Sequence, residues 1–130
     1  MGALFNSFNI GASGMNAQSK RMNAITENIA NADVTKTENG TPFKRKLVRF
    51  IHNQDGSVTS KVVDIKKNPF KEVYSPGHPD ADKNGFVTMP NVDPVKEMID
   101  LNQSSRSFES NLATLEASKR MLLKTINLLR

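Results

Sequence analysis

The fold is decided by one long stretch, residues 93–130: DPVKEMIDLNQSSRSFESNLATLEASKRMLLKTINLLR. Its leucine series recurs at every seventh residue and is apolar throughout: Leu101, Phe108, Leu115, Leu122 and Leu129. An interleaved outer series alternates apolar with polar: Met98, Ser105, Leu112, Lys119 and Ile126. Alternating spacings of three and four are typical of a coiled-coil seam. The stretch therefore predicts a long helix that needs a partner, with Asp93 as its N-cap and Pro94 in its first turn.

A second heptad pattern occupies residues 4–32 at the other end of the chain. Its two series are Phe8, Met15, Met22, Ile29 and Leu4, Gly11, Gln18, Ile25, Ala32. Gly11 and Gly14 each lower helix propensity by about 1 kcal/mol relative to alanine, so we expect this helix to fray before Met15 in the isolated protein. The middle of the chain offers no comparable partner surface. We therefore predict that the two terminal helices pair antiparallel, the alternative being an amphipathic helix on an ordinary core.

Between these patterns the hydrophobic period becomes that of strands. Strands are predicted at residues 47–51 and 58–65, joined by the turn residues 53–56, and at residues 70–74 and 85–89. A loop rich in Pro, Gly and Asp occupies residues 75–84. The predicted fold class is α+β, with two long terminal helices pairing as an antiparallel coiled-coil-like unit. We expect a helical domain from residues 1–32 and 91–130, and a small β-rich inserted domain from residues 33–90.

The composition narrows the classes of function. Of the 130 residues, 37% are hydrophobic and 6% aromatic, which is a thin supply for a large core. The net charge of +5 is mild, and its one basic cluster, Lys44, Arg45, Lys46 and Arg49, would point to both faces of a strand, which argues against nucleic-acid binding. Because the chain has no cysteine, disulfides and thiolate metal sites are excluded. We find no secretory signal and expect no membrane insertion, so ordinary signals indicate the cytosol.

Two stretches invite a search for chemistry. Asp80, Asp82 and Asn84 before Gly85 resemble the start of a calcium loop, but the twelfth position is Asn91 rather than the required glutamate. We therefore predict a structured turn, with no metal and no cofactor. His52 and His78 are the only candidate near-neutral bases, and no phosphate-binding loop or nucleophile with a neighbouring base accompanies them. The chain is predicted not to be an enzyme.

A polar motif, residues 28–32 (NIANA), lies near the predicted end of the first helix. Asparagine suits a helix end or a tie to the following segment. Together with Thr35, this motif resembles the N-terminal signature of bacterial flagellar rod and hook proteins, although Glu27 departs from it. Residues 74–82 (YSPGHPDAD) and 85–92 resemble the proximal-rod proteins of the C type, the FlgC family. The motif residues are Asn28, Ala30, Asn31, Thr35, Tyr74, Pro76, His78, Pro79, Asp80, Asp82, Gly85, Met89, Pro90 and Asn91.

The resemblance implies a structural subunit of the flagellar basal-body proximal rod. Such subunits stack axially with copies of themselves and neighbouring rod proteins, transmit torque from the motor ring to the distal rod and hook, and form part of the export channel wall. The resemblance further implies passage through the flagellar type III export apparatus without a cleaved signal peptide, and a final place in the rod within the periplasmic space. A cytosolic location would then hold only before export. A coiled-coil adaptor or scaffold of another assembly remains the alternative.

Periodicity supplies the residues expected to make the assembly contacts, within the chain or between subunits. This assembly seam comprises Phe8, Met15, Met22, Ile25, Ile29, Met98, Leu101, Phe108, Leu112, Leu115, Leu122, Ile126 and Leu129. Interruptions at Gly11, Gly14 and Gln18 in one stripe, and at Ser105 and Lys119 in the other, would weaken an isolated pair. Such a pair suits a tube in which each helix touches several neighbours.

Overall fold

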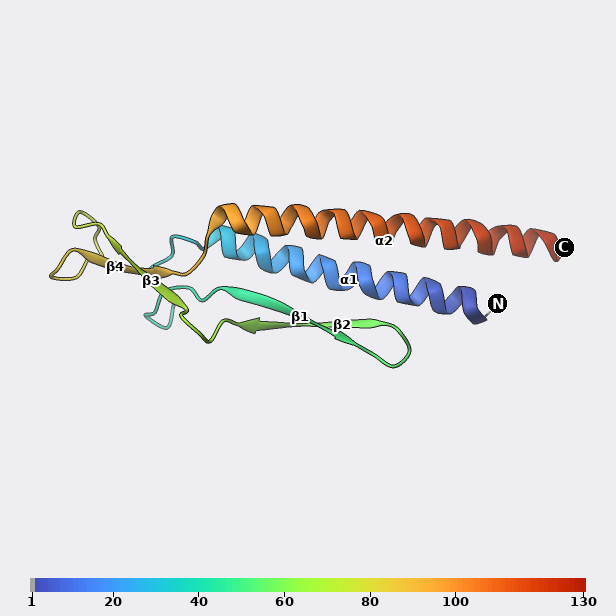
Figure 1. The fold of residues 1–130 in the computed structure, drawn as a ribbon, viewed down its shortest axis with the longest axis horizontal. Helices are drawn as coiled ribbons and strands as arrows, with labels where there is room; N and C mark the ends of the chain where they lie inside the picture. The colour runs from blue at the N-terminus through green and yellow to red at the C-terminus, as the bar shows by residue number, and fades with distance from the viewer. Residues whose placement is uncertain (1) are drawn as a thin grey trace.

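A computed structural model describes residues 2–130 and is dominated by two long helices, α1 (Gly2–Ala30) and α2 (Pro94–Leu128). They lie side by side and antiparallel, so both chain termini are at one end of an elongated molecule (Figure 1). The strands lie between them in the sequence and form two hairpins. The predicted α+β class, with paired terminal helices and a small β region, is confirmed.

The β region consists of two separate antiparallel hairpins rather than one sheet. In the first, β1 (Lys46–His52) pairs with β2 (Val58–Asp64), and Lys46 lies opposite Asp64. In the second, β3 (Phe70–Tyr74) pairs with β4 (Phe86–Pro90), and Tyr74 lies opposite Phe86. The first hairpin runs along α1, whereas the second lies beyond the end of the helices where α2 begins (Figure 1). The predicted strands are confirmed to within one or two residues.

The start of α2 follows the predicted capping chemistry. The Asp93 side chain accepts hydrogen bonds from the backbone N–H groups of Val95 (3.1 Å) and Lys96 (3.5 Å), and Pro94 occupies the first turn. Because each helical residue adds 1.5 Å, the 35 residues of α2 span about 52 Å. The C-terminal end of α2 projects beyond the start of α1 (Figure 1).

The buried face of α2 is not quite the predicted one. Beside the leucine series, it contains the residues that come one position before those of the outer series. Four members of the leucine series are half-buried, but Leu129 is 74% exposed. Beside them, α2 buries or half-buries an inner series: Glu97, Ser104, Asn111, Ser118 and Thr125. The apolar members of the outer series, Met98, Leu112 and Ile126, are 56%, 37% and 39% exposed.

Small residues explain this choice of face. A Cβ atom added at Gly14 would lie 3.1 Å from the side-chain nitrogen of Asn111, so the two helices approach closely where both present little bulk. Ser104 has no exposed surface at all. The larger side chains of the outer series would hold the helices farther apart. They are therefore left outside the intrachain pair.

Helix α1 is covered on a second face by the first hairpin, a contact that the hydrophobic periodicity did not predict, while α2 remains its larger partner. The backbone N–H of Val58 donates to Ser13 Oγ (3.0 Å), and the Arg21 guanidinium lies 6.0 Å from the centre of the Phe50 ring. Ala17, Ala24 and Ile25 of α1 are buried. The helix runs unbroken through Gly11 and Gly14, while its expected fraying in the isolated protein stays a prediction.

The buried face of α2 can be tested by placing the same side chain at two adjacent serines. We expect Ser104→Leu to lower the free energy of unfolding by about 1–3 kcal/mol, because a larger side chain must enter a close-packed contact. The same change at the half-buried Ser105 should lower it less. Urea denaturation followed by circular dichroism measures both. A larger loss for Ser105→Leu would contradict the observed face.

Candidate functional site

The motif residue Asn28 joins the end of α1 to the first strand. Its side-chain Nδ2 donates to the backbone carbonyl of Lys46 (2.8 Å), while the backbone N–H of Lys46 donates to Asn28 Oδ1 (2.8 Å). The amide thus pairs with the edge of β1 as a neighbouring backbone would. Asn28 is 1% exposed, so each of these bonds satisfies a group removed from water.

Glu97 of α2 contacts the same Asn28 side chain from the other side. It is 1% exposed, accepts from Asn28 Nδ2 (3.4 Å) and forms an ion pair with the Nε of Arg45. Arg45 also lies 3.9 Å from a carboxylate oxygen of Asp100. A buried carboxylate is stabilised only when a cation and hydrogen-bond donors surround it. This polar junction of Asn28, Arg45, Lys46, Glu97 and Asp100 therefore fixes α1, β1 and α2 relative to one another.

A second tie holds the loop 75–84 against the segment after α1. Thr35 Oγ1 donates to Asp80 Oδ2 (2.6 Å), and Lys36 Nζ lies 2.9 Å from Asp80 Oδ1. The hydrogen bond from Thr35, followed by the contact with Lys36, lowers the pKa of Asp80 below its ordinary value. His78 Nδ1 accepts from the Asp80 backbone N–H (3.0 Å), which orients the loop around this carboxylate. Two distant parts of the motif, residues 28–35 and 74–82, thus meet at Asp80.

Local turn chemistry shapes the rest of this loop. Asp82 Oδ1 accepts from the backbone N–H groups of Asn84 (2.8 Å) and Phe86 (2.9 Å), and Gly85 has a φ of +86°. A Cβ atom at Gly85 would lie 2.9 Å from the Tyr74 ring, which packs edge to face on Phe86 with centroids 5.4 Å apart. The loop is therefore a structured turn, as predicted. Among residues 2–130 no cluster of three or more His, Asp or Glu side chains is placed to hold a metal.

The remaining motif residues have structural placements of their own. Asn31 Nδ2 donates to the carbonyl of Glu27 (2.8 Å), and the Glu27 side chain pairs with Lys46 Nζ (2.8 Å). Asn91 Nδ2 donates to the carbonyl of Asn68 (3.0 Å), and Pro90 is buried. Of the others, Met89 and His78 are half-buried, and Ala30, Pro76 and Pro79 are exposed.

The structure divides the predicted assembly seam into two groups. Buried or half-buried members are Met15, Met22, Ile25, Ile29, Leu101, Phe108, Leu115 and Leu122. Exposed members are Phe8, Met98, Leu112, Ile126 and Leu129. Leu115 of the first group lies where the two helices meet, because a Cβ atom added at Gly11 would be 3.5 Å from its side chain. The second group keeps 37–74% of its surface exposed, and its role in assembly stays a prediction.

Sequence reasoning missed the polar junction at Glu97, Arg45 and Lys46. One signal was present: Glu97 lies four residues before Leu101, on the side of the leucine series where the helix proved to be buried. A single acid at such a position requires a cationic partner. The sequence does not say which of the four clustered basic residues supplies it.

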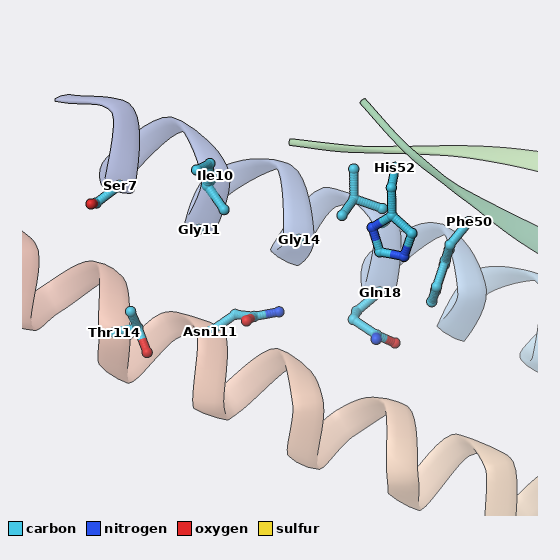
Figure 2. Close-up of a pocket in the computed structure, with 11 residues that line it drawn as sticks. Ser7, Ile10, Gly11, Gly14, Gln18, Phe50, His52, Asn111 and Thr114 are labelled. Atoms are coloured by element: carbon cyan, nitrogen blue, oxygen red, sulfur yellow. The ribbon is translucent and has the colours of Figure 1, made fainter. Parts of the chain in front are cut away.

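A trough lies along α1, between the first hairpin and α2 (Figure 2). It encloses about 520 Å³. Its floor is the α1 stripe Ser7, Gly11, Gly14 and Gln18. Phe50, His52 and Val58 of the hairpin line one side, and Asn111 and Thr114 of α2 line the other. Because two floor positions are glycines, the α1 backbone forms part of the surface.

Comparison with known proteins shows which family this chain belongs to. A family model described as flagella basal body rod protein matches residues 8–36, and one described as flagellar basal body rod FlgEFG protein C-terminal matches residues 83–128. The flagellar basal-body rod protein FlgC of Salmonella typhimurium strain LT2 is 44% identical over 97% of this chain and 98% of its own length. The chain belongs to the FlgC family.

Other FlgC relatives extend this similarity to distant bacteria. FlgC of Aquifex aeolicus is 40% identical over 94% of both chains, and FlgC of Bacillus subtilis is 36% identical over 95% of this chain and 97% of its own. The two family models cover most of α1, the Thr35 segment, and α2 with β4. The first hairpin and most of the loop around Asp80 lie outside both. FlgC is thus a family of structural rod proteins. Across residues 2–130, neither helix is long and apolar enough to cross a membrane.

The polar junction predicts a large difference between the two motif asparagines. We expect Asn28→Ala to lower the free energy of unfolding by about 1–3 kcal/mol, because it leaves buried groups of Lys46 and Glu97 without partners. Asn31→Ala removes one exposed bond and should cost less than about 0.5 kcal/mol. Denaturant titrations of both variants check this. Equal losses would mean that the junction does not couple the elements.

The Asp80 contacts predict a defined dependence on pH. Because the folded pKa lies below the ordinary value of 3.8, this carboxylate stabilises the fold above about pH 3.8, and the contribution is lost as the pH falls through the folded pKa. Thr35→Val should raise the pKa of Asp80 toward its ordinary value. Thr37→Val, whose hydroxyl only donates to the nearby Thr41 carbonyl, is the control. Carboxyl NMR titration distinguishes them, and an unchanged Asp80 in Thr35→Val would contradict the assignment.

Proposed function

We propose that this chain is a structural subunit of the flagellar basal-body rod and has no enzymatic activity. The observation that carries the proposal is its similarity, over nearly the whole chain, to proteins named flagellar basal-body rod protein FlgC. The physical features support the same role. Two terminal helices form a stiff antiparallel pair, and large apolar side chains stay exposed along it.

Polymerisation supplies the burial that the isolated chain does not provide. Phe5, Met98, Ile99, Met121 and Leu123 are 50–62% exposed, although burying such side chains is favourable. Contacts that join unlike surfaces of identical subunits propagate into helical filaments. The subunits therefore stack axially with copies of themselves and neighbouring rod proteins. The helical pair, residues 1–32 with 91–130, forms the rod core, and residues 33–90 form the inserted β-rich domain.

The rod connects the motor ring to the distal rod and hook, so its subunits transmit torque, and their helices line part of the export channel. The subunit reaches this place in the periplasmic space through the flagellar type III export apparatus, without a cleaved signal peptide. The polar junction supports torque transmission, because it ties three elements with directional bonds rather than with apolar contacts alone. No nucleic acid and no cofactor enter this function.

A substitution inside the helical pair separates assembly from export. We expect Leu115→Asp to abolish incorporation into hook–basal bodies, because it places a charge between the helices, while leaving secretion intact. The control Leu115→Met keeps the volume and should incorporate normally. Immunoblots of purified hook–basal bodies and of the culture medium measure the two steps. Normal rods containing Leu115→Asp would contradict the role of the pair, and wild-type chain confined to the cytoplasm would indicate an adaptor instead.

A further inference from the structure

We propose that the trough on α1 receives the C-terminal tip, residues 126–130, of a second copy of this chain. The proposal rests on the rod function above and identifies one of its subunit contacts. It follows from two surfaces of the same molecule that match each other in shape and chemistry. The trough lies partway along the helical pair, whereas the tip lies at its end (Figure 1).

The trough is shaped to accept the end of a helix. Gly11 and Gly14 place no side chain on its floor, and Phe50 and Val58 supply an apolar wall (Figure 2). The fitting occupant is therefore a helix end that carries apolar side chains.

The C-terminal tip carries such side chains. Leu128 and Leu129 are 87% and 74% exposed, the highest values among the large apolar side chains of the part of the chain that the structure describes. The C-terminal end of α2, which carries them, projects beyond the start of α1 (Figure 1). One helix end thus supplies the apolar side chains that fit the trough.

The charge distribution favours a second copy as the source of this tip. Residues 93–116 contain five acidic and two basic side chains, whereas residues 117–130 contain four basic and none acidic. Residues 2–19 of α1, which run beside the basic part, contain no charge. Parallel, staggered copies would bring the basic end of one α2 beside the acidic part of the next. Such complementarity guides association and fixes its register.

The contact implies a particular stagger between neighbours. Placing the tip of one copy level with Asn111 and Thr114 of the next shifts the helices by about 15–17 residues, or about 25 Å along the axis. Trough and tip are different surfaces, so the contact is head-to-tail and leaves each added subunit with one free trough or tip. Such contacts do not close and can extend a rod.

Disulfide cross-linking tests the contact directly, because the natural chain has no cysteine. The informative variant carries Thr114→Cys at the edge of the trough and Leu128→Cys in the tip. These positions lie in one helix about 21 Å apart, far beyond the roughly 7 Å limit for a disulfide, so any bond joins two chains. The matched control pairs Leu128→Cys with Glu116→Cys, an exposed position that does not line the trough.

Both variants replace the wild-type chain in a motile strain, and whole cells and purified hook–basal bodies are treated with a mild oxidant. We expect a disulfide-linked homodimer with Thr114→Cys and Leu128→Cys, and loss of that dimer in the control. Co-expressed chains carrying one cysteine each should give the same dimer. Mass spectrometry of the linked peptide identifies both partners.

The remaining outcomes separate the contact from the rod function. Chain present in hook–basal bodies without the dimer would overturn the tip-in-trough contact and leave the rod function standing. A cross-link from Thr114→Cys to a different rod protein would overturn the second copy as occupant. Chain absent from hook–basal bodies, with the dimer still formed in whole cells, would overturn the rod function and support the contact.

Discussion

The arrangement of this protein depends on burying one carboxylate, that of Glu97, between two helices and a strand. A charge removed from water must find a cation and donors, and Arg45 and Asn28 provide them from different elements. Because Asn28 also occupies both hydrogen-bonding groups of Lys46, the end of α1, the start of β1 and the first turn of α2 meet at one place. Apolar contacts along the helices tolerate sliding, whereas these directional bonds permit a single register.

That register determines which surface of α2 remains available to neighbours. Residues at intervals of seven lie on nearly the same side of a helix. Because Glu97 is directed inward, Ser104, Asn111 and Ser118 therefore also lie on the buried side. The larger Met98, Leu112 and Ile126 are displaced toward solvent. A polar interaction at one end of the helical pair thereby preserves an apolar stripe along the length of the pair. This division suits a subunit that must be a stable pair by itself and still bind several others.

The second hairpin and its loop are held by a separate set of contacts. They are tied to the helical pair through Thr35, Lys36 and Asp80, close to the polar junction but independent of it. The family models match the two helices and the Thr35 segment, and leave most of this loop unmatched. The family models thus cover mainly the helical pair, while the loop carries several of the motif residues.

The sequence by itself determined the helices, their antiparallel pairing, the strand positions and the family, because periodicity, capping at Asp93 and motif residues are local or repetitive signals. It also identified Asn28 and Asp80 as motif residues without saying what they bind. Only the tertiary structure decided that Glu97 and Ser104 are fully buried while Met98 is exposed and Ser105 is half-buried, and that the first hairpin covers α1. The inner series, which includes Glu97, and the outer series, which includes Met98, flank the same leucine series and are offset by one position in the sequence. The choice between them depends on partners 52 and 69 positions away in the chain, Arg45 and Asn28, which no local pattern specifies.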